Sequence, residues 1–369
     1  MSDPRIDKLA QVLVNYSVAI QPGDKVLVRG GTPAEPLLKA VYAQVLQAGG
    51  HPMLMVSLPG TEELFFRYAS DEQLQHVPEP LKLTVETFDA TIGIMGENNT
   101  KSLSNVDPAK MVLRSQAQSE LMQTYMRRAA AGELRWVGTL FPTNAHAQDA
   151  EMSLSEYEDF VYGACMPDLD DPVGYWHRFS AWQQKIVDWL AGKERVHVVG
   201  PETELHLSIA GRTFINSDGH HNMPSGEVFT GPVEDSVEGH VHFSYPAIYQ
   251  GREVSGVRLW FEQGRVVKAT ADKNEDFLLQ TLDTDAGSRY LGEFAIGTNK
   301  GITQFTHQIL FDEKINGSFH MAVGAGYPET GSKNVSAIHW DMICDMRDGG
   351  EIWVDDELLY QNGEFAIEF

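Results

Sequence analysis

The stretch Lys25–Leu58, KVLVRGGTPAEPLLKAVYAQVLQAGGHPMLMVSL, decides the fold of the N-terminal part of the chain. Its first four residues are an apolar run that predicts a strand ended by Gly30 and Gly31. Apolar residues at helical spacing over 33–47 predict a helix, and 52–58 is a second apolar run. The order of strand, helix and strand indicates a β-α-β unit.

The neighbouring segments continue this alternation. Helical spacing predicts further helices at 4–19, 80–87 and 107–131, and apolar runs predict strands at 90–95 and 134–140. Alternating strands and helices indicate a mostly parallel sheet flanked by helices. The turn after the first strand lacks the spacings of both common phosphate-binding motifs, so an ordinary strand-to-helix turn is the favoured interpretation.

Beyond residue 190 the sequence changes character. Short β-like runs separated by turns lie at 196–199, 205–209, 212–215, 237–245, 257–261 and 266–271, and helices are predicted near 272–284 and 299–312. The 369 residues exceed the roughly 250–300 that one hydrophobic core supports. We therefore predict an α/β N-terminal domain, 1–190, a β-rich α+β C-terminal domain, 191–369, and a crossing segment at 151–192 that belongs almost wholly to the first.

The charge of the chain limits its partners. There are 28 Lys and Arg residues against 52 Asp and Glu residues, a formal charge of −24. This charge repels a polyphosphate backbone, and no basic stripe offsets it, so we expect no nucleic-acid partner. Nine of the 13 histidines and most of the acidic excess fall in 191–369. Carboxylates and imidazoles in one region suit a metal site, although surface acidity for solubility is the simpler explanation.

Cysteine content and the N-terminus indicate the compartment. Only Cys165 and Cys344 are present, too few for a disulfide framework. The first residues, MSDPRIDKLAQ, lack the layout of a signal peptide, and no stretch approaches the ~20 apolar residues of a membrane span. We expect a cytoplasmic protein with no membrane partner.

The segment 336–344, SAIHWDMIC, is the most informative for function. If it is a strand, its even-numbered residues form a wholly apolar face that belongs against a core. Its other face carries His339 and Asp341, which point the same way because side chains two apart on a strand share a face. This pair suits metal ligation or a proton relay. A simply solvent-exposed face is an equally open interpretation of this segment alone.

Three other segments place polar groups inside apolar runs. His320 lies within SFHMAVG, Glu293 within YLGEFAIG, and Glu227 begins a β-like run after a Pro/Gly turn. Each one alone has an ordinary interpretation as a core histidine, a salt bridge or an exposed strand end. With Tyr327 and the His-x-Asp pair, they make a set suited to two divalent cations that share a bridging carboxylate.

Four motifs in this half carry a family resemblance. NMPSGEVFTGP (222–232), LGEFAIGTNKGI (291–302), FHMAVGAGYPETG (319–331) and AIHWDMI (337–343) are similar, in order and spacing, to those of the thermophilic aminopeptidase family of two-metal exopeptidases, the M29 type. The N-terminal segments GDKVLVRG and GENNTKSLSNVDP are similar to family segments as well. The resemblance therefore spans most of the chain.

The resemblance implies a site and an activity. It implies a metalloaminopeptidase that holds two zinc or cobalt ions in its C-terminal domain, commonly as a homodimer. Such an enzyme releases N-terminal amino acids from peptides with a free N-terminus, through attack of a metal-activated water on the first peptide bond. The implied metal ligands are Glu227, Glu293, His320, Tyr327, His339 and Asp341.

Two of these residues have expected catalytic roles. Glu293 is our choice for the proton shuttle, with Glu227 as the alternative, because a carboxylate beside the water can pass its proton to the leaving amine. Tyr327 could ligate a cation or donate a hydrogen bond to the oxyanion. The segment from Tyr327 to His339 is shorter than in many relatives, which leaves the ligands in place but affects the shape of the pocket.

The same residues are compatible with other functions. A different metal-dependent amidase or esterase, or a non-catalytic metal- or peptide-binding protein, fits the same scaffold. His240 and His242 resemble half a metal site but lack a matching carboxylate motif, and His307 is expected to pack on the predicted helix 299–312. His-Glu-x-x-His and Gly-x-Ser-x-Gly motifs are absent from the sequence, which excludes the helical zinc-protease design and gives no support to a serine hydrolase. No binding site for an organic cofactor is predicted.

Overall fold

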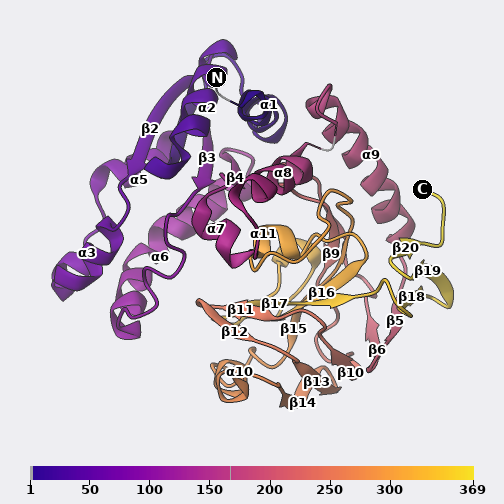
Figure 1. Cartoon of the computed structure of the whole chain (residues 1–369). Helices are drawn as coiled ribbons and strands as arrows, with labels where there is room; N and C mark the ends of the chain where they lie inside the picture. Colours follow the sequence, from indigo (N-terminus) through magenta and orange to yellow (C-terminus); the bar gives the residue numbers. More distant parts are fainter. Residues whose placement is uncertain (1–2, 167) are drawn as a thin grey trace. The chain divides into compact units, whose positions relative to one another are not determined.

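The computed structural model describes residues 3–166 and 168–369, which form two compact units (Figure 1). The first unit comprises residues 1–177 and 219–224, and the second comprises 178–218 and 225–369. Helix α9 (Pro172–Leu190) begins in the first unit and continues in the second. The units thus divide within α9, whereas we expected a boundary after residue 190.

The first unit is built on a five-stranded parallel sheet of order β2-β1-β3-β4-β8. Its strands are β1 (Lys25–Gly31), β2 (His51–Ser57), β3 (Ala90–Met95), β4 (Arg135–Leu140) and β8 (Asn222–Met223). The predicted β-α-β unit is confirmed, since β1 and β2 pair in parallel and α2 packs on both. Buried Val26, Val28, Ile92 and Val137 explain why these apolar runs form central strands.

Helices flank this sheet, as the alternating pattern predicted. They are α1 (Pro4–Gln11), α2 (Glu35–Gln47), α3 (Thr61–Tyr68), α4 (Asp71–Gln75), α5 (Glu79–Thr87), α6 (Pro108–Ala130), α7 (Asn144–Asp149) and α8 (Leu154–Cys165), with a π-helix at Val12–Ser17 and a 3₁₀ helix at Thr32–Ala34. Helix α1 packs on α2 and α8, and α6 packs on α4 and α5. Within the described residues, no helix combines the length and the apolar character that crossing a membrane requires.

The second unit contains two antiparallel sheets. The five-stranded sheet has the order β17-β16-β15-β9-β7, and the eight-stranded sheet has the order β14-β13-β10-β6-β5-β18-β19-β20. The strands of the smaller sheet are β7 (Ile215–Ser217), β9 (Glu227–Thr230), β15 (Leu291–Gly297), β16 (Ser318–Gly324) and β17 (His339–Asp345). Those of the larger sheet are β5 (Arg195–Gly200), β6 (Thr203–Ser208), β10 (Glu238–His242), β13 (Arg258–Glu262), β14 (Arg265–Thr270), β18 (Glu351–Val354), β19 (Glu357–Gln361) and β20 (Glu364–Phe365).

A hairpin and two short helices complete this unit. They are β11 (Ala247–Tyr249), β12 (Arg252–Val254), α10 (Glu275–Leu282) and α11 (Ile309–Asp312), with a 3₁₀ helix at Pro328–Thr330. Helix α10 lies inside the predicted helix 272–284, which is confirmed.

The predicted helix at 299–312 is wrong for most of its length, because only α11 is helical. The Asp312 carboxylate accepts hydrogen bonds from the backbone N–H and the hydroxyl of Thr306, at 2.7 and 2.8 Å. The Asn299 side chain donates to the Ser225 carbonyl and accepts from the Gly301 N–H. These bonds satisfy the backbone of the segment in an irregular loop. His307 lies in this loop with φ of 60°, not on a helix.

One hydrophobic core runs through the second unit. Strands β15, β16 and β17 contribute Phe294, Phe319, Met321 and Trp340, and the eight-stranded sheet contributes Val198, Leu205, Val241 and Leu259. The even-numbered residues 338–344 all belong to this core, as their alternation predicted. The opposite face of the smaller sheet is therefore free to carry polar groups.

Candidate metal centre

The polar residues predicted from the strand patterns lie on one face of the five-stranded sheet. Glu227 begins β9, Glu293 lies on β15, His320 on β16, and His339 and Asp341 on β17. The register pairs Gly297 with Glu227, Ala295 with His320, Ala322 with both Glu293 and Asp341, and Gly324 with His339. Each polar side chain thus has a neighbour that is Ala or Gly, and these small residues leave room on the sheet for the longer groups.

The side chains meet in two groups of three that share one carboxylate. Glu227, Glu293 and His320 form the first group, and Glu293, His339 and Asp341 form the second, with the ligand atoms of each group within 4.8 Å of one another. Glu293 directs Oε1 toward His320 Nε2, at 3.7 Å, and Oε2 toward His339 Nε2, at 3.2 Å. A carboxylate with one oxygen in each group is suited to bridge two cations.

The outer ligand atoms complete these groups. His320 Nε2 lies 3.4 Å from Glu227 Oε2, and His339 Nε2 lies 3.4 Å from Asp341 Oδ1. His339 Nδ1 lies 2.7 Å from the Ala325 carbonyl oxygen. Because a carbonyl only accepts, Nδ1 carries the proton and Nε2 faces the carboxylates, which is the orientation of a metal-ligating histidine.

Tyr327 lies at the edge of this group. Its ring contacts the rings of His339 and Phe229, with centroids 5.2 and 5.3 Å away, and 37% of its surface is exposed. Burial of the hydroxyl and the carboxylate charges of Glu293 and Asp341 raise the pKa of Tyr327. The phenol therefore stays protonated at neutral pH and can donate a hydrogen bond.

Two residues that sequence reasoning missed join the site from the loop before β16. Glu313 forms a third group of possible ligands with His320 and Asp341. Lys314 is fully buried, makes an ion pair with Glu313 and places Nζ 3.7 Å from Glu227 Oε1. The available signal was the run Asp312-Glu313-Lys314, which lies between apolar residues, begins at the last residue of the predicted helix 299–312 and precedes the strand of His320.

The close packing of carboxylates and imidazoles shifts the pKa values of the site. Burial by itself lowers the pKa of an imidazole. The contact with Glu293 and the charge of Glu227 nevertheless raise the pKa of His320 to about 9, and the charge of Asp341, followed by the contact with Glu293, raises that of His339 to about 12. Burial is the largest single influence on Asp341 and raises its pKa, but the contact with His339 and the positive charges of His339, His320 and Lys314 together lower the pKa of this carboxyl group. The carboxylates thus favour positive charge close to them. Protons on the histidines supply this charge when no metal ion is bound.

Unsatisfied polar atoms indicate that these residues fit metal ions. Within the described part of the chain, Glu227 Oε2, His320 Nδ1 and Asp341 Oδ1 are buried and have no hydrogen-bond partner. Imidazole nitrogens lie 3.4 Å from both carboxylate oxygens, and buried carboxylate oxygens that accept no hydrogen bond are costly unless a cation neutralises them. Oxygen and imidazole nitrogen are also the donors that divalent first-row metals prefer. The donor set and its unmet charge therefore suit divalent cations.

Several other histidines belong to other parts of the chain. His240 and His242 lie on β10 of the eight-stranded sheet, where His242 Nδ1 is 3.6 Å from Glu202 Oε1. In the first unit, the ring of His220 contacts Tyr16 and that of His221 stacks on Trp136. Cys344 is buried on the apolar face, and burial raises the pKa of its thiol to about 12, so the thiol is inert.

Comparison with known proteins identifies similar chains. Aminopeptidase 2 of Geobacillus stearothermophilus is 27% identical over 99% of this chain and 98% of its own length. Aminopeptidase T of Thermus thermophilus is 25% identical over 97% and 95%. The solved structure of wild-type AmpT from Thermus thermophilus matches with a TM-score of 0.86 at 22% identity, covering 99% of both chains, which shows a shared fold.

The fold alone does not determine the chemistry. A 2,5-dihydroxypyridine dioxygenase from Pseudomonas putida KT2440 matches with a TM-score of 0.60 at 12% identity, covering 100% of this chain and 99% of its own. The decisive match is to the sequence profile described as thermophilic metalloprotease (M29), which covers residues 2–365. This chain therefore belongs to the thermophilic metalloprotease family, M29, and is a metal-dependent peptidase.

Proposed function

We propose that this metal-dependent aminopeptidase holds two divalent cations in the groups Glu227–Glu293–His320 and Glu293–His339–Asp341. The observation that carries the proposal is Glu293, which supplies one oxygen to each group. When bound, a pair of cations lowers the pKa of a water, polarises the carbonyl oxygen of the scissile bond and offers a position for the free α-amine of a peptide.

The bridging position of Glu293 bears on its predicted role as proton shuttle. Both of its oxygens already face imidazoles, which supports a ligand role and leaves no free oxygen for a proton. Glu313 is a second carboxylate beside His320 and Asp341, and its side chain remains 15% exposed. We assign the shuttle to Glu313, where a proton can pass between water and the leaving amine.

Two further residues have positioning or catalytic tasks in this proposal. Lys314 fixes Glu313 and Glu227 by its buried positive charge. Tyr327 donates a hydrogen bond to the oxygen that becomes negative when the amide carbonyl is attacked. Its exposed fraction is consistent with contact to a substrate.

We also propose that the bound metal is zinc or cobalt, that Tyr327 can serve as an additional ligand and that the protein is cytoplasmic. A homodimer is supported by β2, the edge strand of the parallel sheet, where Met53, Leu54 and Val56 are 37–45% exposed. An exposed apolar edge strand can pair with another chain, so β2 is suited to contact a second copy.

One assay tests the proposed activity against its alternatives. The metal-loaded protein is expected to release p-nitroaniline from amino-acid p-nitroanilides with a free α-amine, to stop when a chelator is added, and to spare N-acetylated substrates. Equal rates on blocked substrates would favour a general amidase or esterase. No cleavage of any free-amine substrate by protein that carries two metal equivalents would favour a binding protein.

A further inference from the structure

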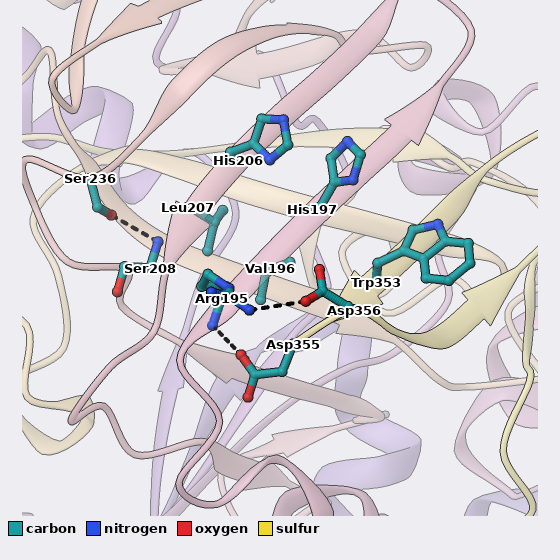
Figure 2. Close-up of a pocket in the computed structure, with 10 residues that line it drawn as sticks. All are labelled: Arg195, Val196, His197, His206, Leu207, Ser208, Ser236, Trp353, Asp355 and Asp356. Atoms are coloured by element: carbon teal, nitrogen blue, oxygen red, sulfur yellow. Dashed lines mark hydrogen bonds and ion pairs between the residues drawn. The ribbon is translucent and has the colours of Figure 1, made fainter.

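A second cluster of possible metal ligands lies on the outer face of the eight-stranded sheet. His197 on β5 and His206 on β6 are direct partners across two antiparallel strands. Their imidazole rings stack with centroids 4.1 Å apart and planes 12° apart. Figure 2 shows both rings side by side on one face of the two strands. Glu204 precedes His206 by two residues and so projects from the same face.

The three side chains converge on one point. Glu204 Oε1 lies 2.7 Å from His197 Nε2 and 3.7 Å from His206 Nε2, and the three ligand atoms lie within 4.8 Å of one another. A tetrahedral ion with bonds of about 2 Å separates its ligand atoms by about 3.3 Å. The two imidazoles are stacked with their planes 12° apart, so binding of one ion requires at least one ring to rotate out of the stack. The fourth position faces solvent, because the three side chains are between 33% and 58% exposed.

The surroundings leave these ligands available. The two histidines line a pocket of about 490 Å³, together with Trp353 and two aspartates (Figure 2). Asp355 accepts hydrogen bonds from backbone N–H groups, including that of Arg195, and Asp356 forms an ion pair with the Arg195 guanidinium at 3.1 Å. Asp355, Asp356 and Arg195 at that end of the pocket thus interact with one another. Trp353 is the partner of His197 on β18, and its Nε1 donates to Glu351.

We propose that His197, Glu204 and His206 bind one divalent first-row transition-metal ion, a site separate from the candidate metal centre on the other sheet. Two imidazoles and one carboxylate are a donor set for Zn²⁺ or Cu²⁺, and Cu²⁺ binds most tightly in the general order of affinities. The ion links β5 to β6. It stabilises the folded protein because an unfolded chain does not hold the three ligands together.

Copper binding by the whole protein tests the site. Enzyme already loaded with its catalytic ions is dialysed against micromolar Cu²⁺, and bound copper is measured by elemental analysis. The wild type is expected to bind one equivalent more than His206→Gln. His76→Gln, which removes an exposed histidine of the first unit, is the matched control and is expected to bind as much as the wild type. Glu204→Gln serves as the second variant if the histidine change disturbs folding.

Two readouts separate this site from the candidate metal centre. Paramagnetic Cu²⁺ is expected to quench the fluorescence of Trp353, so Trp353→Phe loses that part of the quenching. Hydrolysis of free-amine p-nitroanilides by His206→Gln is expected to match the wild type whether or not copper is present. Equal copper content in the wild type, His206→Gln and Glu204→Gln overturns the proposal and leaves the cluster as a stacked, hydrogen-bonded pair of histidines.

Discussion

Lys314 Nζ lies 3.7 Å from Glu227 Oε1, although the two residues are far apart in the sequence. The lysine is fully buried, and its other partner is Glu313. A buried ammonium group among carboxylates keeps their charge tolerable, whether or not metal ions are bound. This contact links the loop before β16 to the first residue of β9.

Replacement of the buried lysine is expected to destabilise the metal-free protein most. Lys314→Met leaves the buried Glu227 and the partly buried Glu313 without their ammonium partner, which costs about 3–5 kcal/mol of unfolding free energy. Urea unfolding with and without metal measures the loss, and bound metal is expected to reduce it. Lys39→Met removes an exposed helical partner of Glu35 and serves as the control, with a change within about 0.5 kcal/mol. Equal stability of Lys314→Met and the wild type without metal contradicts the assigned role.

Substitutions of the proposed ligands are expected to lower the metal content to different extents, because Glu293 is shared by both groups. Glu293→Ala is expected to lower both metal equivalents, because Glu293 belongs to both groups of ligands. Asp341→Ala and Glu227→Ala each remove a ligand from only one of these two groups, so each is expected to retain more metal. Elemental analysis after gel filtration measures the content. Full occupancy by two ions in Glu293→Ala would remove it from the list of ligands.

Oxyanion stabilisation is expected to depend on Tyr327, and its substitution is expected to leave the metal content unchanged. Tyr327→Phe removes one hydrogen-bond donor and is expected to lower kcat by about 10²–10³-fold. Tyr68→Phe, at a position that is 74% exposed, is the control and is expected to keep the wild-type rate. Metal content is measured in parallel. A fall in kcat that follows a loss of metal would point to ligation by Tyr327 instead.

Glu313→Gln tests the shuttle assignment. Loss of a general acid-base group is expected to lower kcat by about 10²–10⁴-fold while the protein keeps both metal ions. Glu329→Gln changes a glutamate of the 3₁₀ helix after Tyr327 and is the matched control. If Glu313→Gln keeps the wild-type rate, the shuttle returns to Glu293 or Glu227.

The loop before β16 is expected to require glycine at position 297. A Cβ at this position would lie 2.2 Å from the Ile315 carbonyl oxygen, so Gly297→Ala forces the backbone after Lys314 away from the sheet. We expect a loss of about 1–3 kcal/mol in unfolding free energy and a lower metal content. Gly163→Ala in α8, where a Cβ meets nothing within 4 Å, is expected to stabilise by up to about 1 kcal/mol. Equal effects of the two changes would show that the close approach is not needed.

The hydrogen bonds that hold the segment before β17 are expected to weaken in acid. Asp285 accepts hydrogen bonds from the Ala337 N–H and from the hydroxyls of Ser288 and Ser336, and these bonds lower the pKa of its carboxyl group from 3.8 to about 2. Because the folded pKa is the lower one, this stabilisation is complete above pH ~4 and is lost as the pH falls to about 2. The stability difference between the wild type and Asp285→Asn, measured by urea unfolding, is expected to shrink over that range. A difference that stays constant with pH would contradict the assignment.

The sequence by itself determined the order of layers and the identity of the polar strand residues. Alternation of apolar runs and helical spacing around Lys25–Leu58 predicted the parallel sheet, because each period records which face of an element is buried. The same rule placed His339 and Asp341 opposite the apolar face of β17. The motifs of the C-terminal half indicated the family that the sequence profile confirms.

Only the tertiary structure decided how these strands converge and what else joins them. The pairing of β9, β15, β16 and β17 brings Glu227, Glu293 and His320 together, and strand register depends on contacts between distant segments. Glu313 and Lys314 were missed, and the helix at 299–312 was wrongly predicted, since side-chain bonds such as Thr306 to Asp312 override local helical spacing. The His197–Glu204–His206 cluster likewise depends on the pairing of β5 with β6, for which the local pattern of either strand carries no signal.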